Sequence, residues 1–236
     1  MCNRISGFLL AAMLLGGVCQ AQAGGGVSLG NTRVIYNEKD RGGATLRVNN
    51  SADNMAYLIQ SWASEYKEAG KKAPFMVSPP LYRQDKGTST LRITRAGGNF
   101  PADRESVFML NVKAIPGENE DTVQARGDKG SVLKFSFLTQ IKLFWRPAGL
   151  SGQADEAYKQ LTFSRASGAL VVKNPTPYFI NLHTLTVAGK DISEQGKMIS
   201  PFGEQRYSVA GSPDKISFQV LNDQGVMSDT FERAVQ

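Results

Sequence analysis

Apolar and polar residues alternate along much of this chain, and the longest alternating run covers residues 132–147. Its more apolar face carries, at every second position, Leu133, Phe135, Phe137, Thr139, Ile141, Leu143 and Trp145. The intervening positions are mostly polar or basic, with Leu138 and Phe144 as exceptions. A period of two is typical of strands, and strands usually have about 5–6 residues. The run therefore predicts one unusually long β-strand.

The apolar face of this strand needs a partner surface, and the pattern allows two kinds. The face could form half of a sandwich core within this chain. Alternatively, the strand has an unpaired edge to which a strand of another chain adds. Alternation alone does not distinguish the two interpretations.

Shorter alternating runs, separated by Gly, Pro, Asn and Asp, recur along the rest of the chain. They cover residues 44–48, 57–62, 90–94, 107–112, 169–172, 178–187, 216–221 and 226–231. Strands at this spacing predict antiparallel sandwiches. Residues 154–161 suggest a helical turn or two, and the small residues at 148–152 place a hinge near residues 147–152.

The first 23 residues have the features of a cleaved signal peptide. Arg4 gives a short positive region, and residues 5–18 are an apolar stretch too short to span a bilayer. Ala21 and Ala23 form an A-x-A cleavage site, so we expect cleavage after Ala23. Later stretches are neither long nor apolar enough for a transmembrane helix, so an exported, soluble product is expected.

Both cysteines, Cys2 and Cys19, lie in the segment that we expect to be removed. Lipidation of Cys19 is the alternative, but Val18 is bulky where a small residue should precede a lipidated cysteine. A mature chain without cysteine excludes thiolate nucleophiles, thiolate metal sites and redox chemistry. Stability must come from packed cores, and the 213 residues from 24 to 236 suffice for two.

Charge and the remaining motifs exclude further functions. Without Arg4, 26 basic residues stand against 21 acidic ones, and their mixing along the chain predicts a solvated surface and no nucleic-acid partner. His183 is the single histidine and has no carboxylate cluster beside it in sequence, so neither a metal site nor a His-dependent triad is expected. Phosphate-binding glycine motifs do not occur, and we expect no cofactor.

Six segments occur in the order of one known family. They are VSLGNTRVIY (27–36), YLIQSW (57–62), SPPLYRQDKG (78–87), DRESVFMLNVKAIP (103–116), IKLFWRP (141–147) and NPTPYFINL (174–182). IKLFWRP resembles the signature that closes the first domain of periplasmic pilus chaperones, the PapD-like family. The chain resembles this family over nearly its whole mature length.

The resemblance implies an all-β fold with two immunoglobulin-like sandwiches in an L or boomerang arrangement and a cleft between them. We expect a signal peptide over residues 1–23, a first domain over 24–147 and a second over 152–236. The first domain would contain a long donor strand near residues 131–146. This architecture and its mode of strand addition are known for the PapD case.

The implied function is that of a periplasmic chaperone, which is not an enzyme. Such a protein binds, folds and stabilises pilus or fimbrial subunits by donor-strand complementation and delivers them to an outer-membrane usher. No stable membrane insertion is expected, and the free protein is expected to be able to self-associate. The rival interpretations are a periplasmic hydrolase and a secreted adhesin or carbohydrate-binding module with exposed aromatic platforms.

The resemblance also assigns roles to individual residues. Arg33 and Lys142 match the two basic residues that anchor the C-terminal carboxylate of the subunit at the base of the cleft. Glu105, Arg146 and Asp223 match a trio of charges that links the two domains. The positions that enter the subunit groove are Ser131, Leu133, Phe135 and Phe137.

One segment departs from the family pattern. Residues 117–130 form a longer loop than the short-loop subclass has, yet the cysteine pair of the long-loop subclass is missing. We favour the short-loop type, and the subclass stays open. The adjacent prolines Pro79 and Pro80 make a cis bond plausible at that turn.

Overall fold

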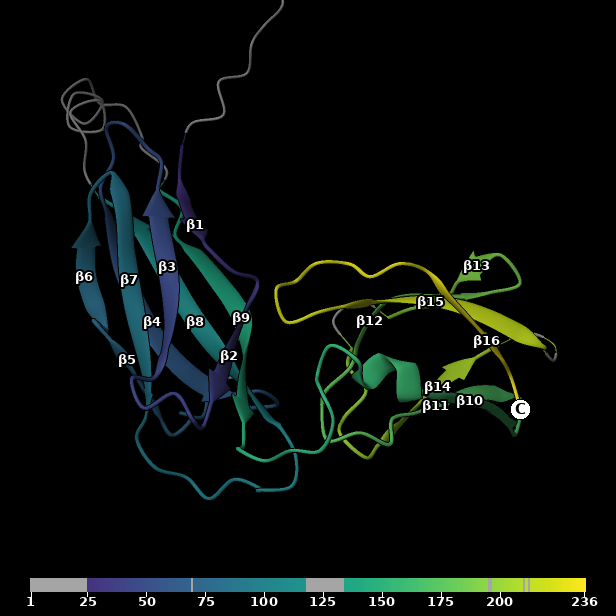
Figure 1. Cartoon of the computed structure of the whole chain (residues 1–236). Coiled ribbons are helices and arrows are strands. Elements are labelled where there is room, and N and C mark those ends of the chain that lie inside the picture. Colours follow the sequence, from purple (N-terminus) through teal and green to yellow (C-terminus); the bar gives the residue numbers. More distant parts are fainter. Residues whose placement is uncertain (1–24, 69, 118–133, 195–196, 210, 212) are drawn as a thin grey trace, which may run out of the picture.

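The computed structural model describes residues 25–68, 70–117, 134–194, 197–209, 211 and 213–236. This part of the chain consists of strands and loops with one short 3-10 turn. Figure 1 shows two separate pairs of sheets, the first coloured purple to teal and the second green to yellow. The predicted all-β class with two sandwiches is confirmed.

The first sandwich contains β1 to β9. One sheet has the order β1 (Val27–Leu29), β3 (Ala44–Asn50), β7 (Gly87–Arg95) and β5 (Phe75–Ser78). The facing sheet has the order β2 (Arg33–Asn37), β9 (Phe137–Arg146), β8 (Ser106–Pro116), β4 (Tyr57–Glu65) and β6 (Leu81–Gln84). Alternate side chains of the two sheets meet in the core, where Leu46, Ile59, Leu91 and Leu110 are at most 1% exposed.

The second sandwich contains the remaining strands. Its two sheets have the orders β10 (Thr162–Ala166), β11 (Ala169–Lys173), β14 (Glu204–Ser208) and β13 (Lys190–Asp191), β12 (Asn181–Val187), β15 (Lys215–Leu221), β16 (Phe231–Ala234). Phe218 is fully buried at the centre, with its ring 5.1 Å from that of Phe163. The buried cores of the two sandwiches have no residue in common, so each sandwich buries its own apolar face.

The long strand β9 divides into two parts. Its side chains Ile141, Leu143 and Trp145 are buried in the first core, whereas Phe137 is 61% exposed although it belongs to the same face. β8 pairs antiparallel with β9 from Phe137 onward, and β2 pairs parallel with it only from Lys142. Within the described residues, the edge of β9 over residues 137–141 that faces away from β8 has no strand beside it.

The predicted start of this strand was wrong. β9 begins at Phe137, and residues 134–136 belong to no strand, whereas the sequence predicted a strand from residue 132. The partner strand explains the difference: Ala114 lies opposite Phe137, and β8 ends two residues later at Pro116. Proline has no N–H to donate to a ladder, so pairing does not extend further. Residues 131–133 lie outside the described part, as do residues 118–130 of the long loop.

Two other strand predictions were misplaced, because side chains hold the local backbone in turns. Asn222 accepts hydrogen bonds from the N–H groups of Gln224 and Val226, so residues 226–230 form a loop and the strand begins at Phe231. β12 begins at Asn181 and not at residue 178, since the amide of Asn174 donates to the carbonyl of Tyr178. These are turns in which a short polar side chain replaces a ladder partner.

Two other predictions are confirmed. The 3-10 turn η1 (Ala157–Gln160) lies within the predicted helical segment 154–161. The Ser78–Pro79 bond is cis.

The two sandwiches are arranged as an L in Figure 1, with β2 and β9 of the first lying nearest to the second. Residues 147–152 connect them. None of the described helices is long and apolar enough to cross a membrane.

Candidate binding site between the two sandwiches

The outer face of the β2–β9 pair turns toward the second sandwich. The register places Arg33 beside Lys142 and Asn37 beside Arg146. Because side chains alternate along a strand and Leu143 is in the core, Lys142, Phe144 and Arg146 project from the opposite face. The ring of Phe144 lies 5.7 Å from that of Phe179 in the second sandwich.

Two cations lie side by side on this face. Arg33 is 8% exposed, and the buried Nε of its guanidinium has no hydrogen-bond partner among the described residues. The Lys142 ammonium donates a 3.1 Å hydrogen bond to the side-chain carbonyl of Asn181, the first residue of β12. The sequence-predicted pair is thus brought together, and the second sandwich contributes Asn181 to it.

Burial disfavours the charged forms of Arg33 and Lys142. Burial, together with the smaller effect of the neighbouring charge of Arg33, lowers the pKa of Lys142 to about 8. Burial also lowers the pKa of Arg33, which the charge of Asp223 partly opposes. A carboxylate entering here would favour both charged forms, because an opposite charge stabilises a buried cation. The site therefore has the chemistry of an anion receptor.

Arg146 donates three hydrogen bonds to carboxylates, and the two to Asp223 connect the two sandwiches. Its Nε donates to Glu105 Oε1 at 2.6 Å, and its two terminal nitrogens donate to the carboxylate of Asp223 at 2.7 and 3.0 Å. The guanidinium also lies over the ring of Tyr178, at 5.3 Å from the centroid. The structure brings together the three predicted charges, with Asp223 supplied by the second sandwich.

Glu105 is the most buried member of this trio, at 4% exposed. Its Oε2 accepts the N–H of Phe179 at 2.8 Å, and its own N–H donates to the carbonyl of Pro177 at 2.9 Å. Burial raises the pKa of Glu105, although the charge of Arg146 and the hydrogen bonds oppose this rise. Burial alone would lower the pKa of Arg146, but its bonds to Asp223 and both carboxylate charges raise it overall.

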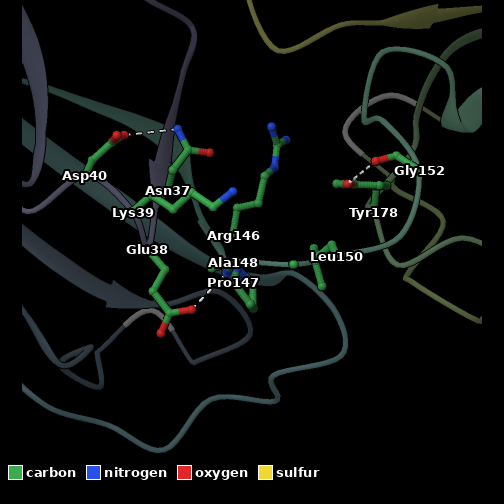
Figure 2. Close-up of a pocket in the computed structure, with 11 residues that line it drawn as sticks. Asn37, Glu38, Lys39, Asp40, Arg146, Pro147, Ala148, Leu150, Gly152 and Tyr178 are labelled. Atoms are coloured by element: carbon green, nitrogen blue, oxygen red, sulfur yellow. Dashed lines mark hydrogen bonds between the residues drawn. The ribbon is translucent and has the colours of Figure 1, made fainter.

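The linker is held to the first sandwich beside a pocket of about 370 Å³, shown in Figure 2. The N–H of Ala148 donates to the carboxylate of Glu38 at 2.8 Å. On the other side, the hydroxyl of Tyr178 donates to the carbonyl of Gly152 at 3.1 Å, and Figure 2 shows both interactions. Each end of the linker is therefore tied to one sandwich.

Sequence reasoning missed the aromatic contacts of this junction. Phe144 packs on Phe179, and the guanidinium of Arg104 lies 4.9 Å from the ring centre of Phe202. The signal for Phe144 was present, since it interrupts the polar face of the long strand. Phe179 and Phe202 carried no comparable signal, because their partners are far away in the sequence.

The predicted groove-filling positions lie at the other end of β9. Phe135 and Phe137 are each 61% exposed, and Leu138 is 50% exposed. Phe137 precedes Lys142 by five residues, which corresponds to roughly 16 Å along a strand. Ser131 and Leu133 fall outside the described residues. An apolar segment thus continues from the buried cations along an open strand edge.

The described residues contain no group of three or more His, Cys, Asp or Glu side chains placed to hold a metal ion. His183 occupies an exposed position in β12.

Two families match the chain in tandem. Residues 26–151 match the family described as "Pili and flagellar-assembly chaperone, PapD N-terminal domain". Residues 156–232 match "Pili assembly chaperone PapD, C-terminal domain". The chain therefore belongs to the PapD-like family of pilus-assembly chaperones.

Relatives and solved structures agree with this assignment. The chain is 34% identical to the chaperone protein LpfB of Salmonella typhimurium (99% of each chain covered) and 36% identical to the chaperone protein FimC of Escherichia coli K12 (95% of this chain, 89% of the other). A structure of Salmonella enterica SafA pilin with the SafB chaperone matches with 35% identity and a TM-score of 0.76, covering 88% of this chain and 95% of the other. The E. coli chaperone DraB matches with 38% identity and the same TM-score, covering 90% and 97%.

Proposed function

We propose that this chain is a periplasmic chaperone for pilus or fimbrial subunits. It binds and folds a subunit by donor-strand complementation and delivers it to an outer-membrane usher. The relatives are named as fimbrial chaperones, and SafB is seen together with a pilin, which supports the same class of partner here. The observation that carries the proposal is the geometry of β9. The exposed Phe137 and an open edge lie at one end, and toward the other end Lys142 lies beside the buried Arg33 of β2.

The open edge of β9 offers backbone N–H and C=O groups to a strand of the subunit. Addition of a strand supplies main-chain hydrogen bonds, and alternate side chains enter pockets of the partner. Phe135 and Phe137, with Ser131 and Leu133 preceding them, fill the groove of an incomplete immunoglobulin-like subunit. Burial of each large apolar side chain contributes about 1.5–3 kcal/mol to the complex.

The C-terminal carboxylate of the subunit is held between Arg33 and Lys142. Charge-assisted hydrogen bonds of this kind contribute roughly 1.5–3 kcal/mol each. The unpartnered Nε of Arg33 and the lowered pKa of Lys142 both support an anionic ligand at this place. Asn181 positions the ammonium of Lys142 from the opposite wall.

The trio of Glu105, Arg146 and Asp223 fixes the angle between the sandwiches. A guanidinium that satisfies two carboxylates holds three chain segments in one geometry. The three short contacts and the burial of Glu105 support this role.

The chain is assigned to the periplasm, with residues 1–23 as a signal peptide cleaved after Ala23. The domains are assigned to residues 24–147 and 152–236, which the two separate cores and the two family matches support. The exposed phenylalanines give the free protein an apolar surface through which it is able to self-associate. A carbohydrate-binding or adhesive function has no use for the buried pair of cations, and no observation favours it.

The test is capture of a subunit from the periplasm. The tagged chaperone, co-expressed with a candidate subunit, should co-purify with it as a one-to-one complex, and Lys142→Ala should abolish this capture. Lys113→Ala is the matched control, because Lys113 lies half-buried on the same outer face in β8. Capture by Lys142→Ala at the unaltered level would contradict the anchor, and glycan binding without subunit capture would contradict the chaperone function.

A further inference from the structure

A pocket of about 170 Å³ in the second sandwich opens beside the two cations. Its apolar walls are formed by Tyr158, Phe179, Val220 and Leu221. Asn181 and the exposed Asp155 add polar groups to the lining. We call it the terminal pocket. The anchor described above makes no use of it.

The terminal pocket lies next to the anchor. A small cavity lined by Arg33 shares Phe179, Asn181 and Leu221 with it, and Asn181 is also the acceptor for the Lys142 ammonium. In any peptide, the Cβ atom of the last residue is only two bonds from the carboxylate carbon. A chain whose carboxylate is held at Arg33 and Lys142 therefore has its last side chain next to this pocket.

We propose that the terminal pocket receives the side chain of the C-terminal residue of the bound subunit and selects an apolar, preferably aromatic one. This inference rests on the carboxylate anchor of the proposed function. The volume suits a single ring, since an apolar cavity of about 150 Å³ in another protein binds benzene. Two aromatic side chains line the walls, and offset or edge-to-face contacts between aromatic rings are favourable. Asp155 disfavours an acidic last residue.

A second cavity next to Arg33 is the competing location for that side chain. It has a volume of about 430 Å³ and a polar lining that includes Asn31, Thr45 and Gln224. A side chain placed there would be selected for polarity. The two locations therefore predict opposite preferences at the last residue of the ligand.

The experiment uses synthetic peptides of alternating valine and threonine that differ only in the last residue. Binding to the whole mature chain is measured by fluorescence anisotropy for peptides ending in Phe, Ala, Lys and Glu, each as a free acid and as an amide. The free acid ending in Phe should bind roughly tenfold or more tightly than the one ending in Ala, because it buries a ring. The acid ending in Glu should bind most weakly.

The outcomes distinguish failure of the carboxylate anchor from failure of the terminal pocket. Equal binding of free acids and amides would overturn the anchor and the terminal pocket together. Free acids that outbind amides, but with equal affinity for Phe and Ala ends, would overturn the pocket alone. The tightest binding by the Lys-terminated acid would overturn the preference for an apolar last residue.

A substitution that fills the pocket gives the complementary test. Ala154 is half-buried and lines the pocket, so Ala154→Leu should bring the ratio of affinities for Phe and Ala ends close to one. Ala166→Leu is the control, because Ala166 is half-buried in β10 and is not part of the pocket lining. It should keep the full ratio. An unchanged ratio in a folded Ala154→Leu protein would contradict the proposal, and the peptide series on the unaltered chain decides it independently of this variant.

Discussion

Arg33 and Lys142 are cations that the fold places next to each other and removes largely from water. Like charges disfavour one another, and desolvation disfavours each separately. The lowered pKa values of both groups express this cost in the free protein. In the proposed anchor, a bound carboxylate would relieve this cost, so part of the binding free energy would come from an unfavourable arrangement that exists before the subunit arrives.

The titration of Lys142 predicts how subunit binding depends on pH. Its pKa is about 8 in the free protein, and a bound carboxylate raises it by favouring the charged form. Affinity should be full below about pH 8 and should fall as pH rises above it, by up to about tenfold per pH unit until the pKa of the complex is reached. Calorimetry of a carboxylate-terminated peptide between about pH 7 and 9.5 should also detect proton uptake at the upper end.

The folding stability of the free protein should change with pH in the opposite direction to the binding affinity. A lysine whose pKa is lower in the folded state than in the unfolded chain binds fewer protons when folded, so stability rises with pH between about 8 and 10.5. Lys142→Arg is the control, since a guanidinium stays charged over this range. Affinity that is flat with pH in the unaltered protein would contradict protonation of Lys142 as a requirement for binding.

Loss of Arg146 should lower the stability of the fold strongly. Arg146→Ala leaves the buried carboxylate of Glu105 without its cation, and breaking a buried pair in this way costs about 3–5 kcal/mol. Removal of Arg146 raises the pKa of Glu105 further above its unfolded value. The loss relative to the unaltered protein should therefore be largest at neutral pH and should shrink as Glu105 is protonated on acidification.

Thermal and denaturant unfolding at several pH values check this prediction. The exposed pair of Arg165 and Asp214, 3.6 Å apart, provides the control, because Arg165→Ala should change stability little. Near-unchanged unfolding of Arg146→Ala at neutral pH would show that the trio does not support the junction.

At the scale of elements, one face of β9 is buried in the core over one half of the strand and exposed over the other half. Ile141, Leu143 and Trp145 fill the core of the first sandwich, while Phe137 stays exposed. The two interpretations left open by the sequence pattern thus apply to different halves of the same strand. The transition between the halves coincides with the end of β2 pairing at Lys142.

This division predicts opposite outcomes for two substitutions to serine on the same face of β9. Phe137→Ser should leave the free protein folded and weaken subunit binding roughly tenfold to a hundredfold, because it removes a ring and places a hydroxyl in an apolar groove. Leu143→Ser should instead unfold the first sandwich, since Leu143 is fully buried. Phe137→Leu should bind better than Phe137→Ser. Unchanged binding by a folded Phe137→Ser protein would remove this position from the mechanism.

Periodicity predicted the strands that alternate clearly. It failed where a partner strand or a turn determines the position at which a strand begins. The phase of β9 was readable, but its start depends on Pro116 in another strand. Short strands such as β5, β6 and β14 have too few residues to show a period. Residues 226–230 alternate in the sequence, yet Asn222 holds them in a loop.

The site residues were predicted from the family resemblance and not from periodicity, and only in part. The resemblance to the family supplied Arg33, Lys142 and the charged trio, which the geometry brings together. Asn181, Phe179 and Phe202 were not predictable, because each meets a partner across the junction between the sandwiches. Such contacts depend on the arrangement of two folded units, which no local pattern in the chain encodes.

At the scale of the whole molecule, two independently packed sandwiches are joined by a polar and aromatic junction. The ion pair of Arg146 with Asp223, the contact of Phe144 with Phe179 and the contact of Arg104 with Phe202 all lie between them. The anchor needs both sandwiches, since Asn181 belongs to the second while Arg33 and Lys142 belong to the first. In the proposed function, a fixed junction would therefore keep the anchor assembled in the free chaperone.

The central claim is that β9 becomes an internal strand of a sheet shared with the subunit. Hydrogen exchange of the backbone amides, measured with and without the bound subunit, tests it most directly. Amides of residues 137–141 that point away from β8 should exchange rapidly in the free chaperone and become strongly protected in the complex, because they gain ladder partners. Protection confined to other parts of the chain, with these amides still exchanging freely, would contradict the account.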